Sequence, residues 1–153
     1  MRDFGRPYKN VLLVDDDSDD RELFAEALSI IDPNISITMQ RDGQELMDYL
    51  STSPLAYDLI FLDLNMPRKN GKECLIEIKA NHRHASTPII IYTTSLNPVD
   101  IEEAFTQGAS FFVRKPNSFE ELKDVLGCLL SGTLPITEKK RESFVVNRDS
   151  KLA

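Results

Sequence analysis

Side chains able to do chemistry stand directly after four apolar runs of this 153-residue sequence. The first run ends in Asp15 and Asp16, and a later run ends in Asp63. A third run is followed by Thr93, and a fourth, after one arginine, by Lys115. Carboxylates, a hydroxyl and an ammonium therefore recur at one kind of position, the end of an apolar segment.

Gathered at one point, these groups would form a phosphoryl-transfer site. Carboxylates a few ångströms apart repel one another and need a compensating cation. Mg²⁺ suits such oxygen ligands, because it takes one or two carboxylates together with phosphate and water. A carboxylate beside the ion can attack phosphorus, while a lysine and a hydroxyl bind the oxygens of the transferred group.

The spacing of the apolar residues predicts the elements that position these groups. Continuous apolar runs indicate buried strands at residues 11–14, 59–62, 89–92 and 111–113. A further strand at 35–39 alternates with polar residues, so one of its faces is expected to be less buried. Five strands alternating with five helices predict right-handed βαβ units and a parallel sheet covered on both sides. Ligands of such open sheets bind beyond the carboxyl ends of the strands.

Capping residues mark where several of the helices begin. Asp17 or Ser18 is expected to cap the first helix, and for Asp17 we favour this role over that of a metal ligand. Asn97 stands before Pro98, which suits the first position of the fourth helix. These signals place the first and fourth helices directly after polar strand ends.

Composition excludes several functional classes. A formal net charge of −7 and a pI near 4.8 argue against a nucleic-acid partner, because phosphate backbones require clustered Lys and Arg. No apolar run approaches the roughly 18 residues of a membrane span, and the N-terminus lacks the apolar core of a signal peptide. Cys74 and Cys128 stand in apolar helical patterns, so we expect buried thiols and no disulfide. We expect a cytoplasmic protein.

Over residues 9–131 the sequence resembles the receiver domains of two-component response regulators. The motifs that carry the resemblance are Leu13-Val14-Asp15-Asp16-Asp17, Asp63 with Met66-Pro67 and Gly71, Thr93-Thr94-Ser95, and Lys115-Pro116. The resemblance implies a flavodoxin-like (βα)5 fold, with a five-stranded parallel sheet in the order 2-1-3-4-5. We expect an N-terminal extension at 1–8, a receiver domain at 9–132 and a flexible, polar tail at 133–153.

The resemblance also implies the roles of the acidic residues. Asp63 would be the phosphoacceptor. Asp16 would be a direct ligand of Mg²⁺, and Asp15 would contribute through water. Asn65 would offer its backbone carbonyl to the same metal ion.

Further roles follow from the same resemblance. Thr93 would bind a phosphoryl oxygen, and Lys115 would pair with the phosphoryl group. The small Thr94 would leave room for access, and Phe112 would occupy the family's switch-aromatic position without the hydroxyl of a tyrosine. The peptide bond between Lys115 and Pro116 would be cis, as is usual in the family.

The function implied is that of a phosphorylation-switched signalling protein. A histidine kinase, or a histidine phosphotransfer protein, would supply the phosphoryl group to Asp63. The response would appear at the face made by the fourth helix, the fifth strand and the fifth helix. Since the roughly 20 residues after Gly132 are too few for a DNA-binding module, we expect output through contacts with a downstream protein. The Thr93-Thr94-Ser95 run is similar to stand-alone regulators paired with bacteriophytochrome kinases.

Other functions remain open on the sequence. The protein could be a phosphorelay intermediate that hands its phosphoryl group to a phosphotransfer protein. Aspartate-nucleophile phosphatases carry an acid two residues after the nucleophile, and here that position is Asn65, so we expect at most slow self-dephosphorylation. A binding module with a degenerate site is a third alternative, against which the intact set Asp16, Asp63, Thr93 and Lys115 speaks.

Two further segments carry expectations. Phe144-Val145-Val146 is the apolar part of the tail and could dock on a partner or on a second subunit, giving a homodimer. His82 and His84 stand in a polar loop without other ligands nearby, so we favour a solvated loop over a metal or pH-sensing site.

Overall fold

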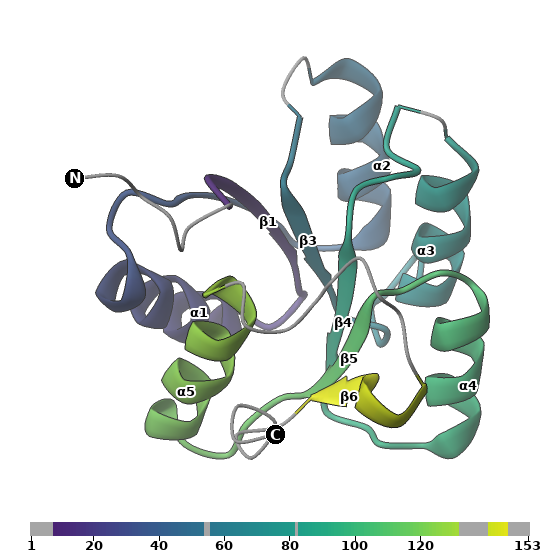
Figure 1. Cartoon of the computed structure of the whole chain (residues 1–153). Coiled ribbons are helices and arrows are strands. Elements are labelled where there is room, and N and C mark those ends of the chain that lie inside the picture. Colours follow the sequence, from purple (N-terminus) through teal and green to yellow (C-terminus); the bar gives the residue numbers. More distant parts are fainter. Residues whose placement is uncertain (1–7, 54–55, 82, 132–140, 147–153) are drawn as a thin grey trace.

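The computed structural model describes residues 8–53, 56–81, 83–131 and 141–146 as a parallel sheet between two layers of helices (Figure 1). Within these residues six parallel strands stand in the order β2-β1-β3-β4-β5-β6. The strands are β1 (Asn10–Val14), β2 (Ser36–Gln40), β3 (Leu59–Leu62), β4 (Ile89–Thr93), β5 (Phe111–Arg114) and β6 (Val145–Val146). The helices are α1 (Ser18–Ile31), α2 (Gly43–Thr52), α3 (Gly71–Ala80), α4 (Pro98–Thr106) and α5 (Phe119–Leu130), with a 3-10 turn η1 (Arg141–Ser143). The flavodoxin-like fold is confirmed, with one strand more than expected.

The burial of the strands follows their sequences. Every side chain of β3 and β4 is buried, because helices cover both faces of the sheet at its centre. Strand β2 lies at one edge, and Gln40 is its one buried residue. The alternating sequence at 35–39 thus corresponds to the less buried strand, as predicted.

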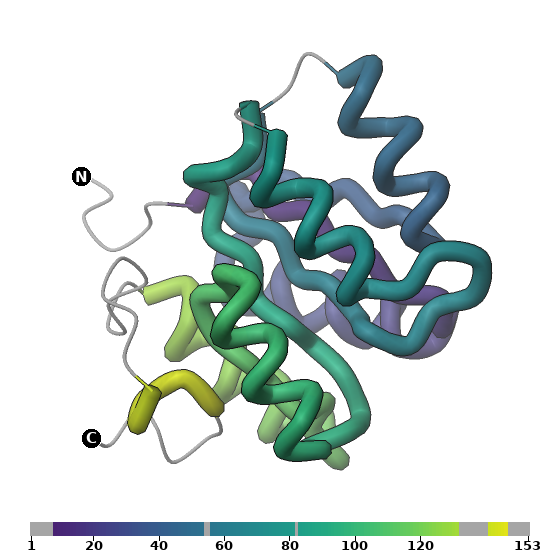
Figure 2. Tube along the Cα trace, turned by 90° about the vertical axis from the view of Figure 1, so that its right-hand side faces the viewer, coloured from purple at the N-terminus to yellow at the C-terminus, as the bar shows by residue number. Residues whose placement is uncertain are grey.

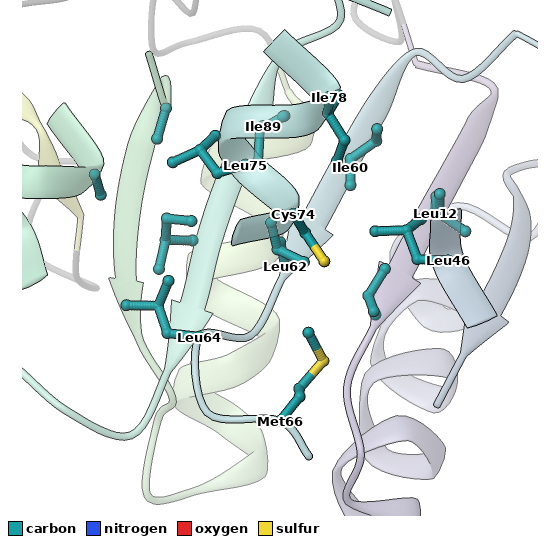
Figure 3. Close-up of a cluster of buried hydrophobic side chains, with 14 of the residues drawn as sticks. Leu12, Leu46, Ile60, Leu62, Leu64, Met66, Cys74, Leu75, Ile78 and Ile89 are labelled. Atoms are coloured by element: carbon teal, nitrogen blue, oxygen red, sulfur yellow. The ribbon is translucent and has the colours of Figure 1, made fainter. Parts of the chain in front are cut away.

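Each face of the sheet carries its own hydrophobic cluster. On one face, helices α2, α3 and α4 cover the strands and face the viewer in Figure 2. Figure 3 shows Cys74 and Leu75 of α3 beside Leu62 and Ile89 of the sheet. On the other face, α1 and α5 pack over the strands (Figure 1). Cys74 and Cys128 are buried and are not joined in a disulfide, as expected.

Capping side chains fix the helix starts that position the strand-end loops. The Asp17 carboxylate accepts hydrogen bonds from two backbone N–H groups of the first turn of α1, and Asn97 caps α4 with proline at its start. Asn70 and Glu73 form a complete capping box at α3. The predicted helix starts at Asp17 and Asn97 are therefore confirmed, and the capping box at α3 is an addition.

The segment around Phe144 differs from the sequence expectation of a flexible tail. Strand β6 pairs with β5, and the Phe112 N–H donates to the Phe144 carbonyl at 2.9 Å. The Phe144 side chain is 2% exposed and meets the Phe105 ring edge-on, with the ring centroids 5.1 Å apart. The physical reason is that β5 would otherwise be a sheet edge with unpaired backbone groups. Residues 132–140 and 147–153 lie outside the described residues, and a homodimer through this segment stays a prediction.

The loop that carries the histidines also differs in part from expectation. His82 lies outside the described residues, whereas His84 is only 4% exposed. Burial lowers the pKa of His84 below its ordinary value, and the nearby Arg83 charge acts in the same direction. The loop is therefore not fully solvated, because the His84 ring is packed inward. None of the helices that the structure describes has the length and apolarity needed to cross a bilayer.

Candidate functional site

The strand ends bring the chemical groups together as the sequence predicts. Strands β1 and β3 are in register at Val14 and Leu62, so the next residues on each, Asp15 and Asp63, are neighbours. The Asp63 N–H donates to the Val14 carbonyl at 3.0 Å. On the next pair of strands, the Lys115 N–H donates to the Thr93 carbonyl at 2.7 Å. One edge of the sheet therefore carries the carboxylates, the hydroxyl and the ammonium.

Three of the carboxylates lie close enough to share a cation. Asp15, Asp16 and Asp63 each offer an oxygen within 4.8 Å of those of the other two. Asp15 and Asp63 are buried, while Asp16 is exposed. A cluster of oxygen ligands open to water on one side fits a hard divalent ion, which keeps part of its water shell.

Lys115 provides the positive charge at the buried side of this cluster. Its Nζ lies 2.8 Å from Asp15 Oδ2 and 3.2 Å from Asp63 Oδ2. A third carboxylate, that of Asp20 in the first turn of α1, is 2.8 Å from the same nitrogen. Asp20 was missed in the sequence, because its acidic type there fits equally well a helix N-terminus, which favours negative charge.

Burial and these ion pairs set the protonation of the site. Burial raises the pKa of Asp15 to about 6, although Lys115 acts to lower it and Asp63 to raise it. Burial would lower the pKa of Lys115, but the carboxylates of Asp15, Asp20 and Asp63 outweigh it and hold that pKa above its usual value. Lys115 is therefore a permanent ammonium, and Asp15 is a carboxylate that additional positive charge would favour.

The hydroxyl of Thr93 lies beside the same cluster. Thr93 is fully buried at the end of β4, and the Asn65 amide donates to its Oγ1 at 3.5 Å. The Asn65 backbone N–H donates to Asp63 Oδ1 at 3.2 Å. Asn65 thus connects Asp63 with Thr93 through its own amides. The resemblance implied a metal-binding role for its backbone carbonyl, but not these contacts of its amides.

The turn after β3 is fixed by a close approach between Gly71 and Asp63. A Cβ on Gly71 would lie 2.1 Å from the Asp63 carbonyl oxygen, so no other residue type fits there without moving α3. The Gly71 N–H donates to the Leu64 carbonyl at 2.9 Å. Next to this turn is an open cleft of about 410 Å³, lined by Asp16, Leu64, Asn65, Met66, Pro67, Asn70, Lys72 and Asp100. Of the three clustered carboxylates, Asp16 is the one that lines this cleft.

Phe112 lies apart from the carboxylates, inside the hydrophobic cluster. It is fully buried, and its ring centroid is 6.3 Å from that of Phe144. Thr94, expected to be small for access, is exposed at the rim. The expectation of a cis bond before Pro116 is wrong, since no peptide bond of the described residues is cis. The trans form is also the one that an X–Pro bond favours in general.

The sequence matches the family described as response regulator receiver domain over residues 11–127. The chain belongs to this family. The response regulator Rcp1 of Synechocystis sp. is 33% identical over 128 residues, which cover 80% of this chain and 86% of Rcp1. These matches confirm the resemblance that the motifs indicated.

Solved structures agree with that assignment. The phosphorylated cyanobacterial phytochrome response regulator RcpA has a TM-score of 0.75 at 31% identity, covering 80% of this chain and 91% of RcpA. The Mn²⁺-bound form of Rcp1 has a TM-score of 0.74 at 28% identity, covering 86% of this chain and 99% of that chain. The chemotaxis response regulator CheY4 of Vibrio cholerae has a TM-score of 0.67 at 28% identity, covering 78% and 96%.

Proposed function

We propose that this receiver domain accepts a phosphoryl group on Asp63 from a phosphohistidine. The observation that carries the proposal is the position of Asp63. It pairs with Lys115, as Asp15 does, and one of its oxygens lies within 4.8 Å of an Asp16 oxygen, close enough for both to bind one cation. An Asp63 carboxylate oxygen attacks phosphorus and forms the O–P bond. The P–N bond to the donor imidazole breaks, and the imidazole nitrogen keeps its electron pair. The product is an aspartyl phosphate.

The donor set supports a divalent metal in this reaction. Asp15, Asp16 and Asp63 would hold Mg²⁺ together with the backbone carbonyl of Asn65, and the manganese-bound form of the relative Rcp1 supports such a site. When bound, the ion offsets the negative charge of the carboxylates and of the phosphoryl oxygens. Asp15 is the ligand for which this matters most, since burial opposes its ionisation.

Lys115 and Thr93 would hold the transferred group. The Lys115 ammonium already lies 3.2 Å from Asp63 Oδ2, so it can pair with a phosphoryl oxygen on that carboxylate. The Thr93 hydroxyl would donate to another phosphoryl oxygen after turning from the Asn65 amide. Both groups stabilise charge on the transferred group and need no proton transfer of their own.

The response would be read at the face formed by α4, β5 and α5. Added charge on Asp63 draws Thr93 inward, and Phe112 on the neighbouring strand β5 adjusts to the space that Thr93 leaves. Because Phe112 contacts Phe144, the change would extend to β6. A downstream protein that binds this face would sense a shift between two states of the domain.

We extend the proposal to the partners and to the cell compartment. The donor would be a sensor histidine kinase of the phytochrome type, as the likeness to the phytochrome response regulator RcpA supports, or a histidine phosphotransfer protein, in which case the domain is a relay intermediate. We place the exchange in the cytoplasm, where cysteines that form no disulfide, such as Cys74 and Cys128, stay reduced. Turnover would be limited to slow self-dephosphorylation, because Asn65 provides no acid or base at the position where phosphatases carry one.

Intact mass spectrometry tests the acceptor. The chain is incubated with Mg²⁺ and acetyl phosphate, and we expect one phosphoryl adduct that is absent when Mg²⁺ is removed with EDTA. Asp63→Asn is expected to carry no adduct, while Asp58→Asn, a carboxylate near the opposite end of the sheet, should behave as the native chain. An adduct that persists in Asp63→Asn, or none on the native chain, would overturn the proposal.

Solution NMR tests the switch. Trifluoroberyllate with Mg²⁺ mimics the phosphoryl group, and we expect amide shifts at Thr93, Phe112 and the residues of β6. Shifts confined to the loops around Asp63 would sink the proposed coupling while leaving the phosphoacceptor role standing.

A further inference from the structure

The Lys115 ammonium is already surrounded by carboxylates before any phosphoryl group arrives. It forms ion pairs with the carboxylates of Asp15, Asp20 and Asp63, at 2.8, 2.8 and 3.2 Å. Those of Asp20 and Asp63 also accept hydrogen bonds from it, whereas Asp15 Oδ2 does not. Its side chain is 9% exposed, which leaves little access for water. A phosphoryl oxygen that binds this ammonium therefore competes with the carboxylates that already hold it.

Asp20 differs from the other two partners of Lys115. Asp15 and Asp63 belong to the cluster that can hold a cation, whereas Asp20 does not. Asp20 is also the partner that water reaches, since its side chain is 31% exposed, against 0% for Asp15 and 5% for Asp63. Releasing Asp20 costs least, because water can solvate its carboxylate at once, whereas a buried carboxylate without a partner is strongly disfavoured.

The local structure fixes Asp20 in this position. Its backbone N–H donates to the capping carboxylate of Asp17 at 3.0 Å, which places the residue in the first turn of α1 directly after β1. The next residue, Arg21, donates to the backbone carbonyl of Asp15 at 2.8 Å. These two bonds join the start of α1 to the loop that carries the carboxylates, so the contact between Asp20 and Lys115 follows from the fold.

We propose that Asp20 is a positioning residue that holds Lys115 in the resting domain and competes with the phosphoryl group for its ammonium. The inference rests on the proposed phosphoacceptor function and adds a determinant of how strongly the phosphorylated state is held. Asp20 also places a fourth negative charge beside the site. It therefore favours a bound divalent cation and opposes the doubly negative phosphoryl group.

Because Asp20 is expected to strengthen cation binding and to weaken phosphoryl binding, its removal should change the two affinities in opposite directions. Asp20→Asn removes one charge and one competitor, so we expect trifluoroberyllate to bind about threefold or more tightly and Mg²⁺ to bind about twofold more weakly, as befits a partly exposed ion pair. Asp19→Asn is the matched control, because it removes the same charge one residue earlier, from an exposed side chain. Asp20→Glu keeps the charge and is expected to return both affinities toward those of the native chain.

Isothermal titration calorimetry on the full chain measures both affinities, first with Mg²⁺ and then with trifluoroberyllate at saturating Mg²⁺. If Asp20→Asn weakens both ligands, Asp20 merely supports the local structure, and the inference is overturned. If it matches Asp19→Asn in both, the competition does not exist, and the inference is again overturned while the phosphoacceptor function stands. If the native chain binds no trifluoroberyllate at all, the proposed function itself fails, and the inference fails with it.

Discussion

Two edges of the same sheet are built on opposite principles. At the carboxyl ends of β1 and β3, carboxylates and one ammonium are held together out of water, and burial works against the charge of Asp15. At the β5–β6 edge, Phe105, Phe112 and Phe144 pack ring against ring, and a backbone hydrogen bond joins the strands. The first edge concentrates charge at a cost in stability, as functional sites commonly do, and the second adds stability through apolar burial.

The strongest test of this contrast removes the central ring of the apolar edge. Phe144→Ala should lower the free energy of unfolding by about 3 kcal/mol, because it deletes a fully buried aromatic side chain. Urea denaturation measures the change, and hydrogen exchange at the Phe112 amide shows whether its bond to Phe144 opens. Val99→Ala, at an exposed site, is the control and should change stability by less than about 0.5 kcal/mol. An equally small effect of Phe144→Ala would show that β6 does not belong to the core.

At the charged edge, a substitution is expected to raise the free energy of unfolding instead of lowering it. In EDTA, Asp15→Asn should raise the free energy of unfolding by about 3 kcal/mol at pH 7.5, because the folded pKa is about 6 and the ordinary value is near 4. The destabilisation by the native carboxylate is absent below the ordinary pKa. It grows between that value and about pH 6, and it stays constant at higher pH. Denaturation at pH 4 and pH 7.5 measures this difference. A gain of the same size at both pH values would contradict the assignment of the penalty to ionisation.

The pKa of the Asp42 carboxylate is shifted in the opposite direction to that of Asp15. The N–H of Glu45 and the guanidinium of Arg68 hold the pKa of Asp42 below its ordinary value. Asp42 therefore stabilises the fold above that ordinary value, and the contribution is lost as the pH falls through the lower folded pKa. Asp42→Ala should lower the free energy of unfolding by about 1 kcal/mol at pH 7, as for other helix caps, and by less at pH 3. If Asp42→Ala instead raised the free energy of unfolding at pH 7, the Asp42 carboxylate would destabilise the fold, as that of Asp15 does.

The smallest change in stability is expected for Arg141, an exposed charged residue beside the apolar edge. Arg141 lies over the Phe105 ring, 4.3 Å from its centroid, and pairs with Glu102. Because Arg141 and Glu102 are both exposed, Arg141→Ala should cost only about 0.5 kcal/mol. Repeating the measurement in 1 M salt should remove much of the ion-pair share. A loss comparable to that of Phe144→Ala would mean that charge, and not apolar packing, holds β6.

The charged edge was accessible from the sequence, and the apolar edge was not. Parallel strands end at one edge of a sheet, and the strand order that the resemblance implied places Asp15 beside Asp63. The contact of Asp20 with Lys115 needs the rotation of α1 about its axis, which residue types do not specify. Phe144 sits in a polar, charged segment, and its burial depends on the open edge of β5, which lies much earlier in the chain. The buried position of His84 likewise involves a residue distant in the chain, since its ring contacts the backbone of Leu50.

The three carboxylates around Lys115 also make it a poor target for amine chemistry. Acetylating and other acylating reagents attack the free base of a lysine, and Lys115 combines a raised pKa with a side chain that is 9% exposed. It should therefore be modified far more slowly than an exposed lysine such as Lys9. Peptide mapping after brief acetylation would show this directly. A rise in the acetylation rate of Lys115 would then report that the site has unfolded.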